Sequence, residues 1–271
     1  MPEIDPISRA LECRQREPLS LLVHERAAPS DFDGARCLRL EFSSRGDRVP
    51  AQLLLPSGGG KHPLTWLQHG LGDSKHADYI GLGARWLREG YAIFTIDFPL
   101  HGERASSKLS ERLATSADLN HSGSQDAVGK LLWNEFMLQA VHDLMRGTDA
   151  LETLDEVDDK RLVYGGFSLG GIVGAIYCAH DPRIRAAALA LSGGGNAKSH
   201  FDPSSHVARI APRPVLFLNA KSDETIPASA SEKLHARATE PKTVRWFDGQ
   251  HKTLPGEAIK TMWQFLRSNL E

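Results

Sequence analysis

The sequence predicts an α/β fold with a mainly parallel central sheet, and three observations support this prediction. Short apolar segments of strand length alternate along the chain with longer segments that have helical periodicity. The segments in the middle of the chain are continuously apolar, which is typical of strands buried on both faces of a parallel sheet. Two earlier segments are joined by a polar turn, which predicts an antiparallel hairpin. Strands that alternate with helices imply right-handed crossovers and helices on both faces of the sheet.

The N-terminal part of the chain supplies the hairpin. Residues 1–30 are a charged segment with one candidate helix at 7–17, which Pro18 ends. Residues 37–42 alternate between apolar and polar side chains, and residues 49–55 return after the turn as the second strand.

The later segments predict the alternation of buried strands and helices. We expect strands at 64–68, 91–97, 161–165, 185–191, 214–220 and 243–247. We expect helices at 77–90, 134–154, 171–179 and 231–238, and a last helix after residue 251. The length of 271 residues and the absence of repeats are compatible with a single domain spanning 1–271.

The segment 166–170 reads Gly-Phe-Ser-Leu-Gly and places Ser168 between a predicted strand and a predicted helix. In this strand–turn–helix context, a Gly-x-Ser-x-Gly pattern forms a nucleophile elbow. The two glycines lack the Cβ atoms that would clash where the chain reverses, and the helix N-terminus favours developing negative charge. Ser168 is therefore the candidate nucleophile. The alternative is a glycine-rich strand-to-helix turn in an inactive relative.

A serine hydroxyl is a weak nucleophile, so it needs a base and an orienting acid from elsewhere in the chain. When the serine lies on such an elbow, the acid and then the histidine follow it along the chain. Asp223 lies in a polar loop directly after the strand expected at 214–220, where a carboxylate can reach a histidine. Glu224 is the neighbouring alternative, and an ordinary surface carboxylate is another. We prefer Asp223 because its side chain is shorter and stiffer.

Among the twelve histidines, His251 lies downstream of Asp223 in a loop that leaves a predicted strand. His235 falls within the helix expected at 231–238. His251 is therefore the candidate general base.

These motifs resemble the α/β-hydrolase superfamily over nearly the whole chain. They are most similar to its dienelactone-hydrolase-like and prolyl-oligopeptidase-like serine esterase branch in the segment 69–72, the segment 97–104, the elbow, Asp223 and the segment 249–251. The resemblance implies an α/β-hydrolase fold and hydrolysis of carboxylic esters. Dienelactone hydrolases proper use a cysteine nucleophile, whereas residue 168 is a serine, so we do not expect ring-opening of dienelactones. The segment 69–72 also lacks the three consecutive glycines of the hormone-sensitive-lipase-like pattern.

Acyl transfer places negative charge on the carbonyl oxygen of the substrate, and two backbone N–H groups must point at this oxygen. The residue after the nucleophile, Leu169, is expected to supply one of them. The second is expected from the loop after the first buried strand, where Gly70 and Gly72 let the backbone turn inward around Leu71. Leu71 is our candidate for the oxyanion hole, with Gly70 and Gly72 as alternatives. The alternative interpretation of the segment that begins at His69 and Gly70 is a tight turn in which His69 is a structural residue that bonds the loop.

The segment 97–104 follows a buried strand and resembles the Asp-x-x-x-x-Gly turn that lies beside the site in this superfamily. We interpret it as structural, with Asp97 pinning the loop and Glu103 or Arg104 pairing locally. A place for His101 in the substrate pocket is the alternative.

Composition limits the partners and the compartment. The net charge is −2 and the charges are spread along the chain, so we expect no nucleic-acid partner. No segment approaches the roughly 20 apolar residues of a membrane span, and the N-terminus lacks the pattern of a secretory signal. Cys13, Cys37 and Cys178 are far apart, which favours reduced thiols over a disulfide framework. We therefore expect a cytoplasmic protein with no membrane association.

We expect a serine hydrolase that cleaves small to medium carboxylic esters through an acyl-enzyme on Ser168. The segment 103–132 is expected to form a small lid or rim, and this modest cover favours small or medium esters over long lipids. We expect no cofactor and no metal, since covalent serine chemistry needs neither and His200 and His206 lie in an irregular loop. The alternatives are a peptidase or thioesterase with the same triad, and a non-catalytic ligand-binding protein on this fold. The sequence makes no prediction of the oligomeric state.

Overall fold

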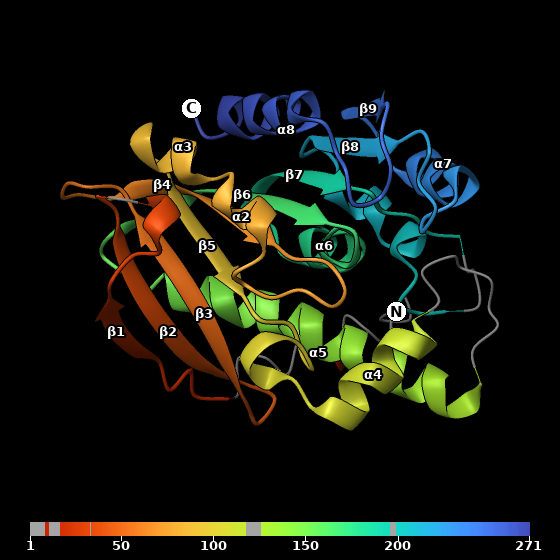
Figure 1. The fold of residues 1–271 in the computed structure, drawn as a ribbon, viewed down its shortest axis with the longest axis horizontal. Coiled ribbons are helices and arrows are strands. Elements are labelled where there is room, and N and C mark those ends of the chain that lie inside the picture. The colour runs from red at the N-terminus through yellow and green to blue at the C-terminus, as the bar shows by residue number, and fades with distance from the viewer. Residues whose placement is uncertain (1–8, 11–16, 33, 118–125, 196–198) are drawn as a thin grey trace.

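The computed structural model describes residues 9–10, 17–32, 34–117, 126–195 and 199–271. A nine-stranded sheet lies at its centre, with the strand order β1-β2-β3-β5-β4-β6-β7-β8-β9 (Figure 1). The strands are β1 (Leu22–Arg26), β2 (Arg36–Ser44), β3 (Asp47–Leu55), β4 (His62–Gln68), β5 (Ala92–Ile96), β6 (Val157–Phe167), β7 (Ile184–Ala190), β8 (Val215–Ala220) and β9 (Lys242–Phe247).

Seven α-helices, together with short 3-10 helices, complete the secondary structure of the described residues. The α-helices are α2 (Asp78–Gly81), α3 (Ala84–Arg88), α4 (Ser107–Ser116), α5 (Ala127–Leu151), α6 (Leu169–His180), α7 (Ala228–Arg237) and α8 (Gly256–Ser268). The 3-10 helices are η2 (Ser30–Phe32), η3 (Gly102–Arg104), η4 (Pro203–Ser205) and η5 (Val207–Ile210).

The sheet is parallel from β5 through β4, β6, β7 and β8 to β9. Strands β1, β2 and β3 add an antiparallel part, and β3 also pairs with β5 in antiparallel register. This arrangement confirms the predicted α/β class with its N-terminal hairpin. Strand β1 was not predicted, because all five of its residues are exposed and no burial pattern marks it.

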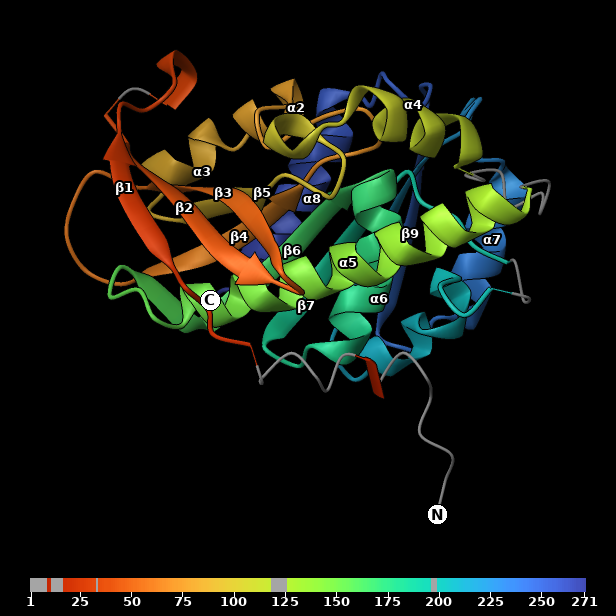
Figure 2. The same cartoon turned by 90° about the horizontal axis from the view of Figure 1, so that it is seen from below.

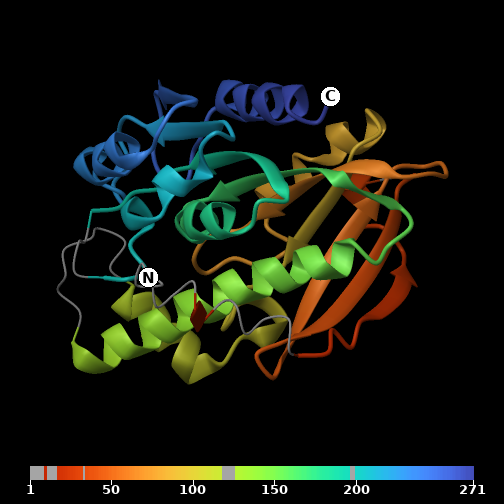
Figure 3. The same cartoon turned by 180° about the vertical axis from the view of Figure 1, so that it is seen from behind.

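Helices cover both faces of the sheet, and an apolar core lies under each layer (Figures 1 and 3). Helices α5 and α6 pack on one face, over a core that includes Trp66 and Tyr177. Figure 2, seen from below, shows α5 lying across the strands with α6 beside it. Helices α3 and α8 pack on the other face, where the rings of Trp86 and Trp263 stack at 4.3 Å.

The parallel register determines where the site forms. Because β4, β6, β8 and β9 run in the same direction, their carboxyl ends meet along one edge of the sheet. The loops that leave this edge carry Gly70 after β4, Ser168 after β6, Asp223 after β8 and His251 after β9. Ligands of open α/β sheets bind outside these carboxyl ends.

The helix expected at 77–90 is instead two short helices, α2 and α3. Gly83 lies between them and packs closely on β5, since a Cβ at this position would lie 2.3 Å from Ile93 Cδ1. The tight approach therefore interrupts a segment that has helical periodicity in the sequence.

The segment 103–132, expected to form a small lid or rim, contains α4 and the start of α5. Helix α5 begins at Ala127 rather than at 134, because the Asp126 carboxylate caps it by accepting from Gly129 N–H at 2.6 Å. Residues 118–125 and most of the helix expected at 7–17 lie outside the described residues.

Candidate active site

Ser168 lies at the sharp turn between β6 and α6. Its φ is +52°, a left-handed conformation that strains a residue with a Cβ. The turn is held from both sides, because Ser168 N–H donates to Ala190 O at 2.8 Å and Ser168 O accepts from Ile172 N–H at 3.0 Å. The elbow predicted from the sequence is thus present as a strained turn within fixed surroundings.

Two glycines allow this turn. A Cβ at Gly166 would lie 2.3 Å from Gly170 O, and a Cβ at Gly170 would lie 2.5 Å from Gln68 O. Both contacts are with backbone atoms, which cannot rotate away as a side chain can. Gly166 lets the end of β6 lie against the first turn of α6, and Gly170 lets the elbow lie against the end of β4, where the loop with Gly70 and Leu71 begins.

The structure brings Ser168, His251 and Asp223 together in one line of hydrogen bonds. His251 Nε2 lies 2.8 Å from Ser168 Oγ, and His251 Nδ1 lies 2.8 and 2.9 Å from the two Asp223 oxygens. Nδ1–H donates to the carboxylate, so Nε2 keeps a lone pair that can accept the serine proton. The side chains of His251 and Asp223 are only 10% and 6% exposed, so water competes little for these contacts.

Asp223 is held as a carboxylate. Burial opposes its ionisation, but hydrogen bonds from His251 and from the backbone outweigh burial, so the pKa of Asp223 lies below its ordinary value. The backbone donors are Thr225 N–H at 2.8 Å and Ile226 N–H at 2.7 Å, both to Oδ1. The negative charge that orients the imidazole is therefore present at neutral pH.

The two rival residues make different contacts. Glu224 Oε2 accepts from the backbone N–H of His251 at 3.2 Å, so it contacts the main chain and not the imidazole. His235 is buried in α7, with its ring 4.6 Å from that of Phe217, and burial lowers its pKa to about 4. The geometry therefore places Asp223 and His251, rather than Glu224 or His235, on the path to Ser168.

His69 joins the loop after β4 to the loop after β5. Its Nδ1–H donates to Gly70 O at 2.8 Å, and its Nε2 accepts from Phe98 N–H at 3.1 Å. Burial lowers the pKa of His69 to about 3, so the ring is neutral and keeps both contacts at ordinary pH. These contacts fit the structural interpretation of His69.

The backbone N–H groups around this loop have different partners. Gly70 N–H donates to Tyr79 Oη at 2.7 Å and is therefore engaged. In the part of the chain that the structure describes, the N–H groups of Leu71 and Leu169 have no acceptor in the protein. Both donors are thus available to a bound molecule.

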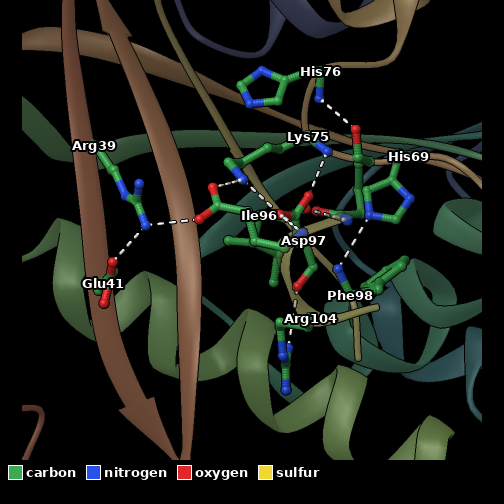
Figure 4. Close-up of polar contacts among 12 residues, drawn as sticks. Arg39, Glu41, His69, Lys75, His76, Ile96, Asp97, Phe98 and Arg104 are labelled. Carbon is green, nitrogen blue, oxygen red and sulfur yellow. Dashed lines mark hydrogen bonds and ion pairs between the residues drawn. The ribbon is translucent and has the colours of Figure 1, made fainter. Parts of the chain in front are cut away.

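A buried charge network holds the same two loops (Figure 4). Lys75 Nζ lies 2.5 Å from Asp97 Oδ2 and 2.6 Å from Glu103 Oε1, and Lys75 N–H donates to Asp97 Oδ1 at 2.8 Å. Burial opposes charge on Asp97, but the Lys75 hydrogen bonds outweigh burial and the pKa of Asp97 is lowered. Arg39 extends the network to β2 by donating to both Glu103 and Glu41. Asp97 therefore pins the loop, as expected.

The local pairing expected for Glu103 or Arg104 is present, because Glu103 N–H donates to Asp97 Oδ2 at 3.0 Å and the Arg104 guanidinium donates to Asp97 O at 3.1 Å. Both side chains also form ion pairs that are distant in the sequence: Glu103 with Lys75 and Arg39, and Arg104 with Asp143 at 2.6 Å. Lys75 was not among the residues predicted for the site, because a lysine in a polar loop carries no signal that it will be buried.

Other features bear less directly on the site. Among the described residues, no group of three or more His, Cys, Asp or Glu side chains is arranged to hold a metal ion. Cys37 and Cys178 are buried free thiols. Within the described ranges, no helix is both long enough and apolar enough to cross a membrane.

The sequence profile of the dienelactone hydrolase family matches residues 70–251. This range runs from the loop after β4 through the elbow and Asp223 to His251. The chain belongs to the dienelactone hydrolase family.

This family member is also similar to an esterase of Escherichia coli and to two acetyl xylan esterases of solved structure. Esterase YjfP of Escherichia coli K12 is 22% identical over 256 residues, which cover 82% of this chain and 96% of YjfP. The acetyl xylan esterase of Paenibacillus sp. R4 superposes with a TM-score of 0.78 at 18% identity and covers 97% of this chain and 93% of its own. Acetyl xylan esterase 1 of Thermoanaerobacterium sp. JW/SL YS485 gives a TM-score of 0.76 at 18% identity, covering 98% and 92%. These likenesses establish the α/β-hydrolase fold of this dienelactone hydrolase family member.

Proposed function

We propose that this chain is a serine hydrolase that cleaves small to medium carboxylic esters through an acyl-enzyme on Ser168. The observation that carries the proposal is the hydrogen-bonded line Ser168–His251–Asp223, in which every contact is 2.8 or 2.9 Å long. The strained backbone of Ser168 supports the same role, since an elbow of this kind presents the hydroxyl away from the sheet.

In the proposed reaction, His251 Nε2 takes the proton from Ser168 Oγ as this oxygen attacks the ester carbonyl carbon. The N–H groups of Leu71 and Leu169 stabilise the oxyanion that forms. His251 then gives its proton to the leaving alcohol as the ester C–O bond breaks. Water, deprotonated by the same imidazole, attacks the acyl-enzyme and releases the acid. Asp223 keeps the Nδ1–H tautomer and stabilises the imidazolium.

The named relatives support esters as the substrate class. YjfP is named an esterase, and two structural neighbours are named acetyl xylan esterases. We therefore propose that short acyl groups, acetyl first, are the acyl part that this site accepts.

A substrate panel tests the proposed class. Purified protein is assayed with p-nitrophenyl esters of increasing acyl length, with a p-nitroanilide and with an acyl thioester. We expect the short esters to be hydrolysed fastest. A thioester or anilide that reacts faster than every ester would replace the esterase by a thioesterase or a peptidase. No turnover of any substrate would favour a ligand-binding protein.

The nucleophile is tested by Ser168→Ala. We expect this variant to lose the burst of acylation and the labelling by a fluorophosphonate, and to keep only the roughly 10³–10⁴-fold residual over water that binding and the oxyanion hole provide. The exposed Ser268 on α8 supplies the matched control, because Ser268→Ala should keep both signals. Mass spectrometry that finds the label on another serine would contradict the assignment.

A further inference from the structure

The hydroxyl of Tyr79 lies where the loop after β4 meets the elbow. It is 2.7 Å from Gly70 N and 3.0 Å from Asp73 Oδ2. The ring of Tyr79 packs against Phe167, the residue before Ser168, with a centroid distance of 4.6 Å. One side chain therefore touches both segments from which the two proposed oxyanion donors come.

The two hydrogen bonds of Tyr79 have a fixed direction. A backbone N–H can only donate and a carboxylate can only accept, so Tyr79 accepts from Gly70 and donates to Asp73. Burial raises the pKa of Tyr79 far above neutrality, so the hydroxyl keeps its proton. Asp73 thereby turns the hydroxyl lone pair toward Gly70 N–H.

These contacts lock two successive peptide planes. Tyr79 holds the plane between His69 and Gly70 through the Gly70 N–H. His69 Nδ1–H holds the next plane through Gly70 O, at 2.8 Å. In a trans peptide the carbonyl and the following N–H point in opposite directions, so fixing Gly70 O also fixes the direction of Leu71 N–H. The engaged Gly70 N–H leaves Leu71, and not Gly70, as the available donor.

The locked loop lies directly against the nucleophile. A Cβ built on Gly70 would lie 3.4 Å from Ser168 Cβ and 3.6 Å from Tyr79 Oη. A small rotation of either peptide plane would therefore move Leu71 N–H relative to Ser168. Displacement of a reacting group by about 1 Å can lower a rate by about 10²-fold.

We propose that Tyr79, oriented by Asp73, is a positioning residue that holds Leu71 N–H in the direction required to bind the oxyanion. This role rests on the proposed ester hydrolysis at Ser168. Tyr79 contacts no reacting atom in this scheme; it acts through the peptide planes of the loop.

Tyr79→Phe tests the proposal, because it keeps the ring on Phe167 and removes only the hydroxyl. We expect kcat toward a short p-nitrophenyl ester to fall by about 10- to 100-fold with little change in KM, since the misplaced donor acts on the transition state. Affinity for a boronic acid, which forms a tetrahedral adduct with the serine, should fall in parallel. Tyr91→Phe is the matched control, since the Tyr91 ring packs on Trp263 on the opposite face from α6.

Amide hydrogen exchange supplies a readout that does not depend on turnover. The Gly70 amide should exchange faster in Tyr79→Phe than in wild type or Tyr91→Phe. Asp73→Ala should reproduce part of the kcat loss of Tyr79→Phe. Asp73→Asn should have a higher kcat than Asp73→Ala, because an amide oxygen can still accept from Tyr79.

Two results overturn the positioning role. One is a Tyr79→Phe enzyme with the kcat and boronate affinity of Tyr91→Phe; the other is a Gly70 amide whose exchange does not change. A wild-type protein inert toward every ester overturns the proposed function and this role with it. Exchange at Gly70 distinguishes these failures, because it reports on the hydrogen bond even in an inert protein.

Discussion

Asp223 and Glu224 contact the same histidine at different atoms. Asp223 accepts from the imidazole Nδ1, whereas Glu224 accepts from the backbone N–H of His251. The first contact sets the tautomer and stabilises positive charge on the ring, and the second only helps to hold the loop. Adjacent carboxylates therefore have different consequences for the proposed chemistry.

Substitution of these two carboxylates separates their roles. Asp223→Asn should keep the loop and lose the charge that selects the Nδ1–H tautomer, a change that lowers kcat by about 10⁴-fold in the worked serine-protease example. Glu224→Gln should change kcat little, because its amide oxygen can still accept from His251 N–H. Steady-state kinetics compares kcat of the two variants, and circular dichroism checks that both are folded. A large loss of kcat in Glu224→Gln together with a nearly unchanged kcat in Asp223→Asn would assign the acid to Glu224.

At the scale of secondary structure, the site depends on how closely α6 approaches the end of β4. The first turn of α6 contains Gly170, and the nearest atoms to a Cβ there are Gln68 O at 2.5 Å and His69 O at 2.8 Å. The elbow and the start of the loop after β4 are therefore in backbone contact, so a change at one is transmitted to the other.

Gly170→Ala should move the first turn of α6 away from the end of β4. The added methyl group meets backbone rather than flexible side chains, so we expect a loss of about 1–3 kcal/mol in the free energy of unfolding together with a fall in kcat. Urea unfolding and ester kinetics measure the two effects. Gly256→Ala, at the start of α8, is the control, since a Cβ at Gly256 meets nothing within 4 Å. Equal stability of the two variants would show that the elbow can relax around the methyl group.

At the scale of the whole molecule, buried titratable groups link stability to pH. Burial lowers the pKa of His69 from 6.5 to about 3, and the hydrogen bonds of Lys75 outweigh burial to lower the pKa of Asp97. In both cases the unfolded chain binds more protons than the folded chain at pH values between the two pKa values. Stability is therefore fully present above the unfolded pKa and is lost as the pH falls.

We expect Tm to fall as the pH is lowered from about 6.5, first through His69 and then, below about pH 4, through Asp97. Asp97→Asn should be less stable than wild type at pH 7 by about 3–5 kcal/mol, because Lys75 is left buried without its main counter-charge. The Tm of Asp97→Asn should also depend less steeply on pH than the Tm of wild type below about pH 4. Calorimetry between pH 7 and pH 2.5 measures both effects.

The control for Asp97 is Asp248, which pairs with Lys221 but is 92% exposed. Asp248→Asn should match wild type over the whole pH range, because water screens an exposed pair. A Tm that is flat between pH 6.5 and pH 4 would contradict the role assigned to His69. An Asp97→Asn protein as stable as Asp248→Asn would contradict the role assigned to the buried pair of Lys75 and Asp97.

Some features of this protein follow from the sequence alone. The alternation of continuous apolar segments with helical ones predicts the α/β class, and the glycines around Ser168 predict a sharp strand-to-helix turn, because both signals are local. The sequence also predicts that Ser168, Asp223 and His251 lie close together. Each residue lies in a loop that follows a recognisable strand, and parallel strands bring their carboxyl ends to the same edge of the sheet.

Other features were decided by tertiary structure. Lys75 lies 22 residues from Asp97, and its burial depends on that partner and on Glu103. The break at Gly83 depends on Ile93 of the neighbouring strand, and the exposed strand β1 exists because β2 offers it an edge. Tyr79 acquires its place beside Gly70 only when the elbow packs on the end of β4. In each case the physical cause is a contact between residues on different elements, and no local pattern of side chains encodes such a contact.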